Sequence, residues 1–144
     1  MVIAQFCDDI RQEIGNKYSL MGCYGDEMVI DKLPAVLPKL CAQIKVLTPA
    51  DRPFIRLLVR ATINGETAAE IEMPVPRIDE KVSEKARTSE TGRLSMVAIM
   101  AISPLPITEP CKVRIEAETE DGIIKGSALS IRERTQEDAP LIPA

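Results

Sequence analysis

The segment CKVRIEAET, residues Cys111–Thr119, gives the clearest indication of the fold. Its odd-numbered positions up to 117 are apolar, and its even-numbered positions are Lys, Arg or Glu. Successive side chains of a β-strand point to opposite faces, so this period of two predicts a strand with one face on a core and the other in water.

Two more alternating segments flank Asn64-Gly65 and predict a hairpin. A two-residue turn would set core residues opposite solvent-facing ones. A three-residue loop, Asn64-Gly65-Glu66, matches the apolar faces, with Gly65 at positive φ and a bulge. Its predicted partners are Ile63 with Thr67, Ala61 with Ala69, Val59 with Ile71, and Arg60 with Glu70, and the apolar face begins at Ile55.

A second hairpin is predicted at Glu120-Asp121-Gly122, but its register stays open. A three-residue loop aligns Val113 with Leu129 and Cys111 with Ile131. A two-residue Asp121-Gly122 loop instead aligns Glu118 with Lys125 and sets Leu129 opposite Arg114. A bulge near Gly126 would reconcile the two registers.

The 11 prolines lie between short segments rich in Ile and Val, or in the C-terminal tail. Since proline cannot donate to a sheet ladder, this spacing favours an all-β chain. We expect an antiparallel Greek-key β-sandwich of about eight strands, immunoglobulin-like in architecture, with a β-barrel as the alternative. Further strands are predicted at 2–7, 10–14, 18–24, 28–30, 40–47 and 94–102.

Residues 94–102 are apolar on both faces, which favours a central strand covered on both sides over a strand at an interface. The polar stretch 77–93 is either a mobile loop or contains a short helix at 79–87. We expect a single domain over 1–132 and a flexible tail over 133–144.

Composition excludes several function classes. The chain of 144 residues has no His and no Trp, only two Phe and two Tyr, and a net charge of −4. Without His there is no Ser-His-Asp or Cys-His catalysis. The negative charge argues against nucleic-acid binding, and no apolar run has the roughly 18–20 residues that span a bilayer. Asp8-Asp9 comes too early for a signal peptide, so a cytoplasmic location is expected.

Two residue types remain as candidate sites. The four cysteines form no Cys-x-x-Cys pair and are expected to be reduced core residues, with Cys23 the most exposed thiol. Asp8, Asp9, Asp26 and Asp31 are weak candidates for a divalent-cation site. Because they lack Asp-x-Asp spacing, turn capping and pairing with Arg11 or Lys17 are favoured, and no metal or cofactor is expected.

The opening FCDDIRQE (residues 6–13) and GNKYSLMGCYG (residues 15–25) resemble an uncharacterised family of bacteria and their phages or prophages. The likeness continues through Leu33–Leu40 and from Pro104 to Ile115, and it spans Val2 to about Ile131. The resemblance implies a small cytoplasmic β-rich protein. It carries no activity, so no residue inherits a catalytic role.

These observations predict a non-enzymatic interaction module that binds a protein partner or itself. A phage or prophage accessory factor acting on a host protein is one form of it. The expected interaction residues are Tyr18, Tyr24, Met96 and Met100. The alternative is a sandwich, either a binding protein or an enzyme, that uses the acidic loops to bind a small ligand or a divalent cation.

Overall fold

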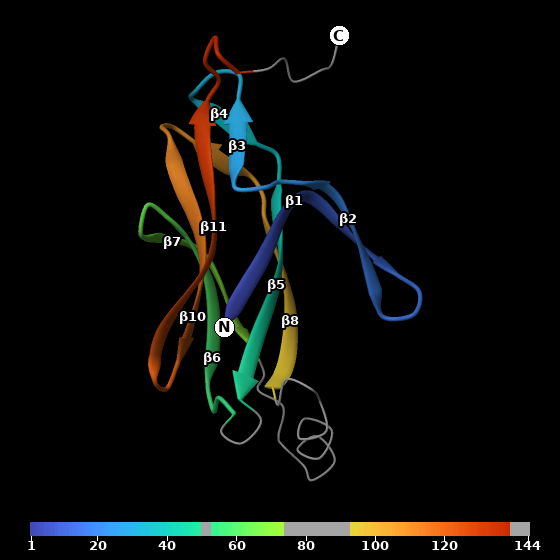
Figure 1. Ribbon diagram of the computed structural model, residues 1–144. Coiled ribbons are helices and arrows are strands. Elements are labelled where there is room, and N and C mark those ends of the chain that lie inside the picture. The colour runs from blue at the N-terminus through green and yellow to red at the C-terminus, as the bar shows by residue number, and fades with distance from the viewer. Residues whose placement is uncertain (50–52, 74–92, 139–144) are drawn as a thin grey trace.

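The computed structural model describes residues 1–49, 53–73 and 93–138, and within them all regular structure is β-strand (Figure 1). The all-β prediction is therefore confirmed. The strands are β1 (Val2–Glu13), β2 (Lys17–Cys23), β3 (Glu27–Ile30), β4 (Ala35–Leu37), β5 (Leu40–Pro49), β6 (Leu57–Ile63), β7 (Glu66–Met73), β8 (Arg93–Ile102), β9 (Leu105–Ile107), β10 (Cys111–Thr119) and β11 (Gly122–Glu133).

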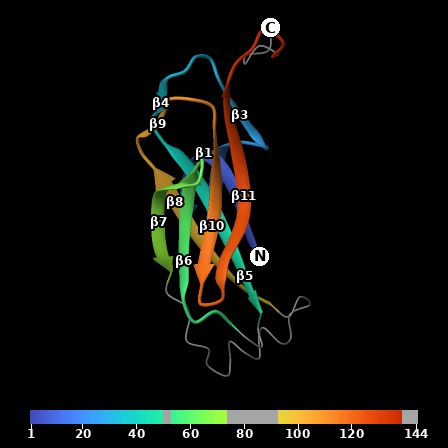
Figure 2. The ribbon, with the colours of Figure 1, turned by 90° about the vertical axis from the view of Figure 1, so that its left-hand side faces the viewer.

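Two sheets form the sandwich, and Figure 2 shows sheet B face-on with sheet A behind it. Sheet A has the order β2-β1-β5-β8, and sheet B has the order β3-β11-β10-β6-β7. A small sheet of β4 and β9 lies at one end. Both large sheets have free edges, so the sandwich rather than the barrel is formed. One pairing departs from the antiparallel expectation, because β3 runs parallel to β11.

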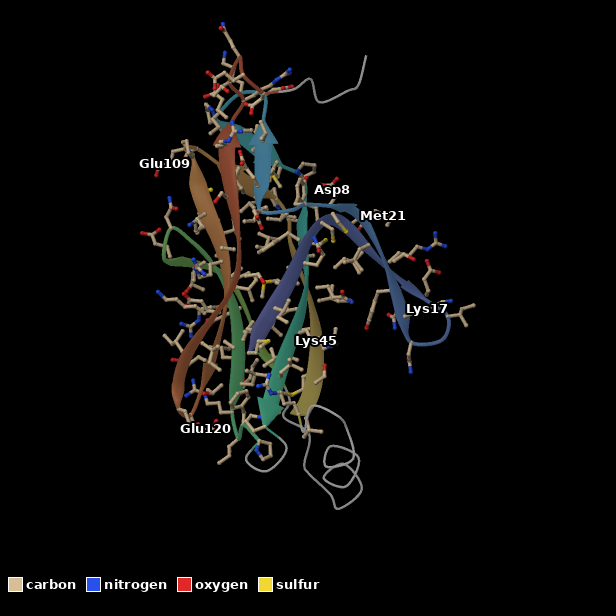
Figure 3. All side chains as sticks on the ribbon, viewed as in Figure 1. Asp8, Lys17, Met21, Lys45, Glu109 and Glu120 are labelled. Atoms are coloured by element: carbon tan, nitrogen blue, oxygen red, sulfur yellow. The ribbon has the colours of Figure 1, made fainter. Side chains whose placement is uncertain are left out.

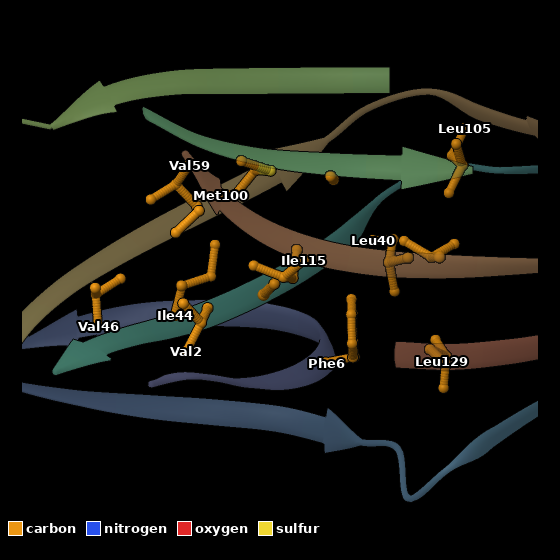
Figure 4. Packing of buried hydrophobic residues seen from close by; sticks show 14 of the residues in the cluster. Val2, Phe6, Leu40, Ile44, Val46, Val59, Met100, Leu105, Ile115 and Leu129 are labelled. Carbon is orange, nitrogen blue, oxygen red and sulfur yellow. The ribbon is translucent and has the colours of Figure 1, made fainter. Parts of the chain in front are cut away.

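The core lies between the two sheets and is built almost entirely from aliphatic side chains (Figure 4). Strand β10 lies in the middle of sheet B, and its Val113, Ile115 and Ala117 are 0% exposed. The alternation of residues 111–119 thus predicts the buried face correctly. Sheet A supplies the opposing side chains, among them Phe6 of β1 and Ile44 of β5.

The β6–β7 hairpin has the predicted body but a different turn. Val59 faces Ile71, Arg60 faces Glu70 and Ala61 faces Ala69, as expected. The register then shifts after Ala61, and Ile63 pairs with Glu66 across a two-residue Asn64-Gly65 turn. Both turn residues have positive φ, +49° and +89°, which suits a hairpin turn that follows the strand twist. The predicted bulge is present, and it returns the apolar side chains of both strands to the same face of the hairpin. The two-residue turn is therefore compatible with the buried face, and the prediction of a three-residue loop was wrong.

The β10–β11 hairpin has one of the two registers that the sequence left open in the part far from the turn, and a third register, which neither alternative gave, next to the turn. Val113 pairs with Leu129 and Cys111 with Ile131, while a shift between Arg114 and Glu116 marks the bulge anticipated near Gly126. The turn residues are Glu120-Asp121, since Thr119 pairs with Gly122. Lys125 consequently lies opposite Glu116 rather than Glu118.

Strand β8 corrects the expectation for residues 94–102. It is an edge strand of sheet A rather than a central one, and its Val97 is 48% exposed. Met96 and Met100 are only 8% and 3% exposed and pack in the core, so they are not the surface residues expected. Ile55 also differs, because it precedes β6 and is 82% exposed.

Two predictions concern the remaining segments. The predicted helix at 79–87, and residues 77–92 of the alternative mobile loop, lie outside the described residues. The predicted tail begins where β11 ends, and its residues up to 138 contact the sandwich. Asp138 accepts hydrogen bonds from the Arg132 guanidinium, and the Arg134 N–H donates to the Ile30 carbonyl at 2.7 Å.

Candidate interaction arm

Strand β1 belongs to the sandwich in its first half and leaves it in its second. Residues Val2–Cys7 pair with β5. From Asp9 to Glu13 the strand pairs only with β2. Residues 8–23 therefore form a two-stranded hairpin that projects from the body, and we call it the arm (Figures 1 and 3).

The arm is exposed along almost its whole length. Every residue of β2 is exposed except Leu20, which is half-buried. Ile14 at the tip is 96% exposed, and Tyr18 and Met21 are 37% and 42% exposed. Strand β2 is also the edge of sheet A, so one side of its backbone faces away from β1. A two-stranded ribbon is only marginally stable by itself in water, which makes such an extension unusual in a small domain.

Tyr24, immediately after the arm, fixes its base on one side. Its hydroxyl donates a hydrogen bond to Asp8 Oδ1. The Gln5 side-chain amide donates to the Tyr24 carbonyl at 2.8 Å, and the Tyr24 N–H donates to the Phe6 carbonyl at 2.9 Å. Burial raises the pKa of Tyr24 above its ordinary value, and the hydrogen bond to the Asp8 carboxylate raises it further. The phenol therefore remains protonated and can act as a donor.

Asp9 fixes the base of the arm on the other face. Its carboxylate lies 2.6 Å from Lys39 Nζ, just before β5, and it also accepts the Ile10 N–H at 3.0 Å. The bond from Lys39 lowers the pKa of Asp9, and the same bond raises the pKa of Lys39. Adjacent strand residues point to opposite faces, so Asp8 and Asp9 together clamp both faces of the arm.

Three of the four acids proposed as weak cation ligands bind separate partners through their carboxylates, and Asp26 accepts a hydrogen bond through its backbone carbonyl. Asp31 lies 3.5 Å from the Arg134 guanidinium, and the Asp26 carbonyl accepts the Ser130 N–H. Asp8 and Asp9 bond to Tyr24 and Lys39, not to the expected Arg11 or Lys17. Within residues 1–49, 53–73 and 93–138, no three His, Cys, Asp or Glu side chains come together in a way that could hold a metal ion.

The structure changes which interaction candidates are relevant. Tyr18 lies on the exposed arm, whereas Tyr24 is a half-buried anchor at its base. The exposed Ile14 and Met21 were missed, because their exposure depends on where the sheets end and not on the residues next to them in the sequence. The segments FCDDIRQE and GNKYSLMGCYG, which carry the expected family resemblance, lie in and beside this hairpin, but the resemblance stays a prediction.

A second apolar area lies on the outer face of sheet A. A shallow hollow is lined by Ile3 and Val97, which are 46% and 48% exposed, and by four polar neighbours. The polar neighbours are Gln5, Gln43, Lys45 and Ser95. This hollow crosses β1, β5 and β8 on the same sheet from which the arm projects.

Comparison with protein-family models, with curated proteins and with solved structures yields no match to this chain. In the described part of the chain, no helix has the length and apolar character needed to cross a bilayer.

Proposed function

We propose that this protein is a non-enzymatic, cytoplasmic interaction module whose binding element is the arm. The proposal rests mainly on β2, in which every residue except Leu20 is exposed, on a hairpin that leaves the sandwich. Removing large apolar side chains from water is favourable, and at the tip of such a hairpin only another molecule can cover them.

The free edge of β2 supports a specific mode of binding. An edge strand presents backbone N–H and C=O groups in the spacing of a sheet, and a partner strand can pair with them. Tyr18, Leu20 and Met21 lie along this edge, and Ile14 lies at the tip, so side chains can add selectivity to the backbone pairing.

The anchors at the base support the same proposal. Because Asp8 and Asp9 are bonded to Tyr24 and Lys39, the arm is held in one direction relative to the body. A preorganised element loses less conformational entropy on binding than a disordered one, which favours affinity. The resemblance to a family of bacteria and phages favours a host protein as the partner.

Site-specific photocrosslinking in the native cell tests the proposal. A photoreactive phenylalanine analogue replaces Tyr18 in the arm, and in the control chain it replaces Ile123, which is 54% exposed in β11. We expect a discrete protein adduct from position 18 that is absent from position 123, and its loss when Ile14→Asp is added. Equal labelling at both positions, or no adduct at position 18, would contradict the proposal.

A further inference from the structure

Three cysteines lie in one row across neighbouring strands of sheet A. Cys7 of β1 is directly opposite Cys23 of β2 on one side and Cys41 of β5 on the other. Directly opposite residues project from the same face of a sheet, with Cβ atoms about 4.5–5.5 Å apart. All three are free thiols, so the central Cys7 has a thiol neighbour on each side.

The two neighbours of Cys7 differ in geometry. The Tyr24 N–H donates to the Phe6 carbonyl, which makes Cys7 and Cys23 a non-hydrogen-bonded pair with Cα atoms about 4.5 Å apart. Cys7 and Cys41 then form a hydrogen-bonded pair, in which the Cα atoms are about 5.5 Å apart. A disulfide needs Cβ atoms roughly 3.5–4.5 Å apart, so the closer Cys7–Cys23 pair is the better match.

The two neighbours also differ in access to solvent. Cys23 is exposed, whereas Cys7 and Cys41 are 0% and 3% exposed. Burial raises the pKa of Cys7 to about 11, and the adjacent Cys41 and Cys23 thiols add to this shift. A dissolved oxidant therefore reacts with Cys23 first, and Cys7 is the neighbouring protonated thiol.

We propose that Cys7 and Cys23 form a reversible intrachain disulfide when the protein reacts with hydrogen peroxide. The Cys23 thiolate attacks the peroxide O–O bond and becomes a sulfenic acid, releasing water after protonation. The Cys7 sulfur then loses its proton and displaces the Cys23 hydroxyl as a second water. Two thiols thus lose two electrons and two protons, the peroxide is reduced to water, and an added dithiol reverses the reaction.

The position of this bond gives it a structural consequence. Cys23 directly precedes Tyr24, which anchors the base of the arm through Asp8. A covalent bond between β1 and β2 at this point joins the two strands where they leave the sandwich. Oxidation would therefore hold the base of the arm closed even when the noncovalent anchors are broken.

Peptide mapping tests this inference cleanly, because trypsin separates all four cysteines. Cleavage after Arg11, Lys17, Lys32, Lys39 and Lys45 leaves Cys7, Cys23 and Cys41 on different peptides, and Cys111 lies on another. The folded chain is treated with stoichiometric hydrogen peroxide, free thiols are alkylated, and the nonreduced digest is analysed by mass spectrometry. We expect one linked pair, residues 1–11 with residues 18–32, that disappears on reduction.

Three variants separate this pair from the alternatives. Cys41→Ala should leave the linked peptide intact, and Cys23→Ser should leave Cys7 alkylatable after peroxide treatment. Cys7→Ala should stop Cys23 at the sulfenic acid, which a dimedone probe labels. Links from Cys23 to Cys41 or Cys111, intermolecular links alone, or four free thiols after treatment would each overturn the proposal. Since Cys23 is exposed, Cys23→Ser keeps the test valid even if Cys7→Ala fails to fold.

Discussion

The sandwich body and the arm share one strand but differ in what surrounds it. Along β1 and into the turn after it, the apolar residues Val2, Phe6, Ile10 and Ile14 recur at every fourth position. Val2 and Phe6 are 5% and 4% exposed, whereas Ile14 is 96% exposed. The spacing of the apolar residues is the same in both halves of β1. Sheet B covers the first half of the strand and does not extend over the second half. Burial is therefore set by a distant part of the chain, and the exposed repeat is available for another molecule.

The largest expected difference between body and arm comes from placing a charge in each. Ile115→Asp puts a carboxylate at a fully buried position of β10 and should unfold the domain, since an unpaired buried charge costs several kcal/mol. Ile14→Asp should change the free energy of unfolding by less than about 0.5 kcal/mol. Urea denaturation followed by circular dichroism measures both. Arg114→Asp, on the opposite face of β10, is the control and should cost little. Equal losses of stability at 114 and 115 would refute the assignment of one buried and one exposed face to β10.

A smaller effect is expected where β1 approaches the β11 bulge. A Cβ on Gly126 would lie 2.8 Å from Val2 Cγ1 and 2.9 Å from the Ile115 carbonyl oxygen. Gly126→Ala should therefore destabilise the body by about 1–3 kcal/mol in the same denaturation experiment. Gly25→Ala, with no atom within 4 Å of the added Cβ, is the matched control and should be nearly neutral. Similar losses from both variants would mean that this close contact does not matter.

Removing the hydrogen bond that anchors the arm should lower the free energy of unfolding by less than the Gly126 substitution does. Tyr24→Phe removes the hydroxyl that bonds to Asp8, and we expect a loss of about 1 kcal/mol. Amide hydrogen exchange should accelerate in residues 9–21 of the arm and stay unchanged in β10. Tyr18→Phe, which removes a hydroxyl from the exposed part of the arm, serves as the control. Faster exchange in the body would show that Tyr24 supports the core instead.

The smallest effect is the pH dependence of the Asp9 anchor. The bond from Lys39 lowers the pKa of Asp9. The stabilisation from this ion pair is therefore fully present above about pH 4, the ordinary pKa of aspartate. The stabilising contribution is lost as the pH falls through the lowered folded pKa. The Ile10 amide resonance reports the titration, because its N–H bonds to Asp9. Its midpoint should lie below the ordinary aspartate value and rise in Lys39→Met, and an unchanged midpoint would contradict the anchor.

The parts of the fold that follow from short-range rules could be predicted. Alternation in residues 111–119 identified the buried face of β10, and parity identified the partners of Val59 and Ala61. The turn itself was missed, since a bulge two residues away can correct a register that looks impossible at Asn64-Gly65.

The features that depend on long-range placement could not be predicted. The two apolar faces of residues 94–102 indicate burial, but nothing local says that β8 has only β5 beside it in sheet A. The cysteines at 7, 23 and 41 show no motif spacing, and only the strand register brings them into one row. The exposure of Ile14 likewise depends on where sheet B ends.

The free energy of unfolding of an arm-shortened chain tests most directly the claim that the arm serves binding rather than folding. Ile10 and Leu20 face each other and, from the alternation next to Cys7–Cys23, form a hydrogen-bonded pair that a two-residue turn can join. Residues 11–19 are replaced by Asn-Gly, and unfolding is measured in urea. We predict a free energy within about 1 kcal/mol of the full chain. A loss of several kcal/mol, or failure to fold, would show that the arm is part of the stable body.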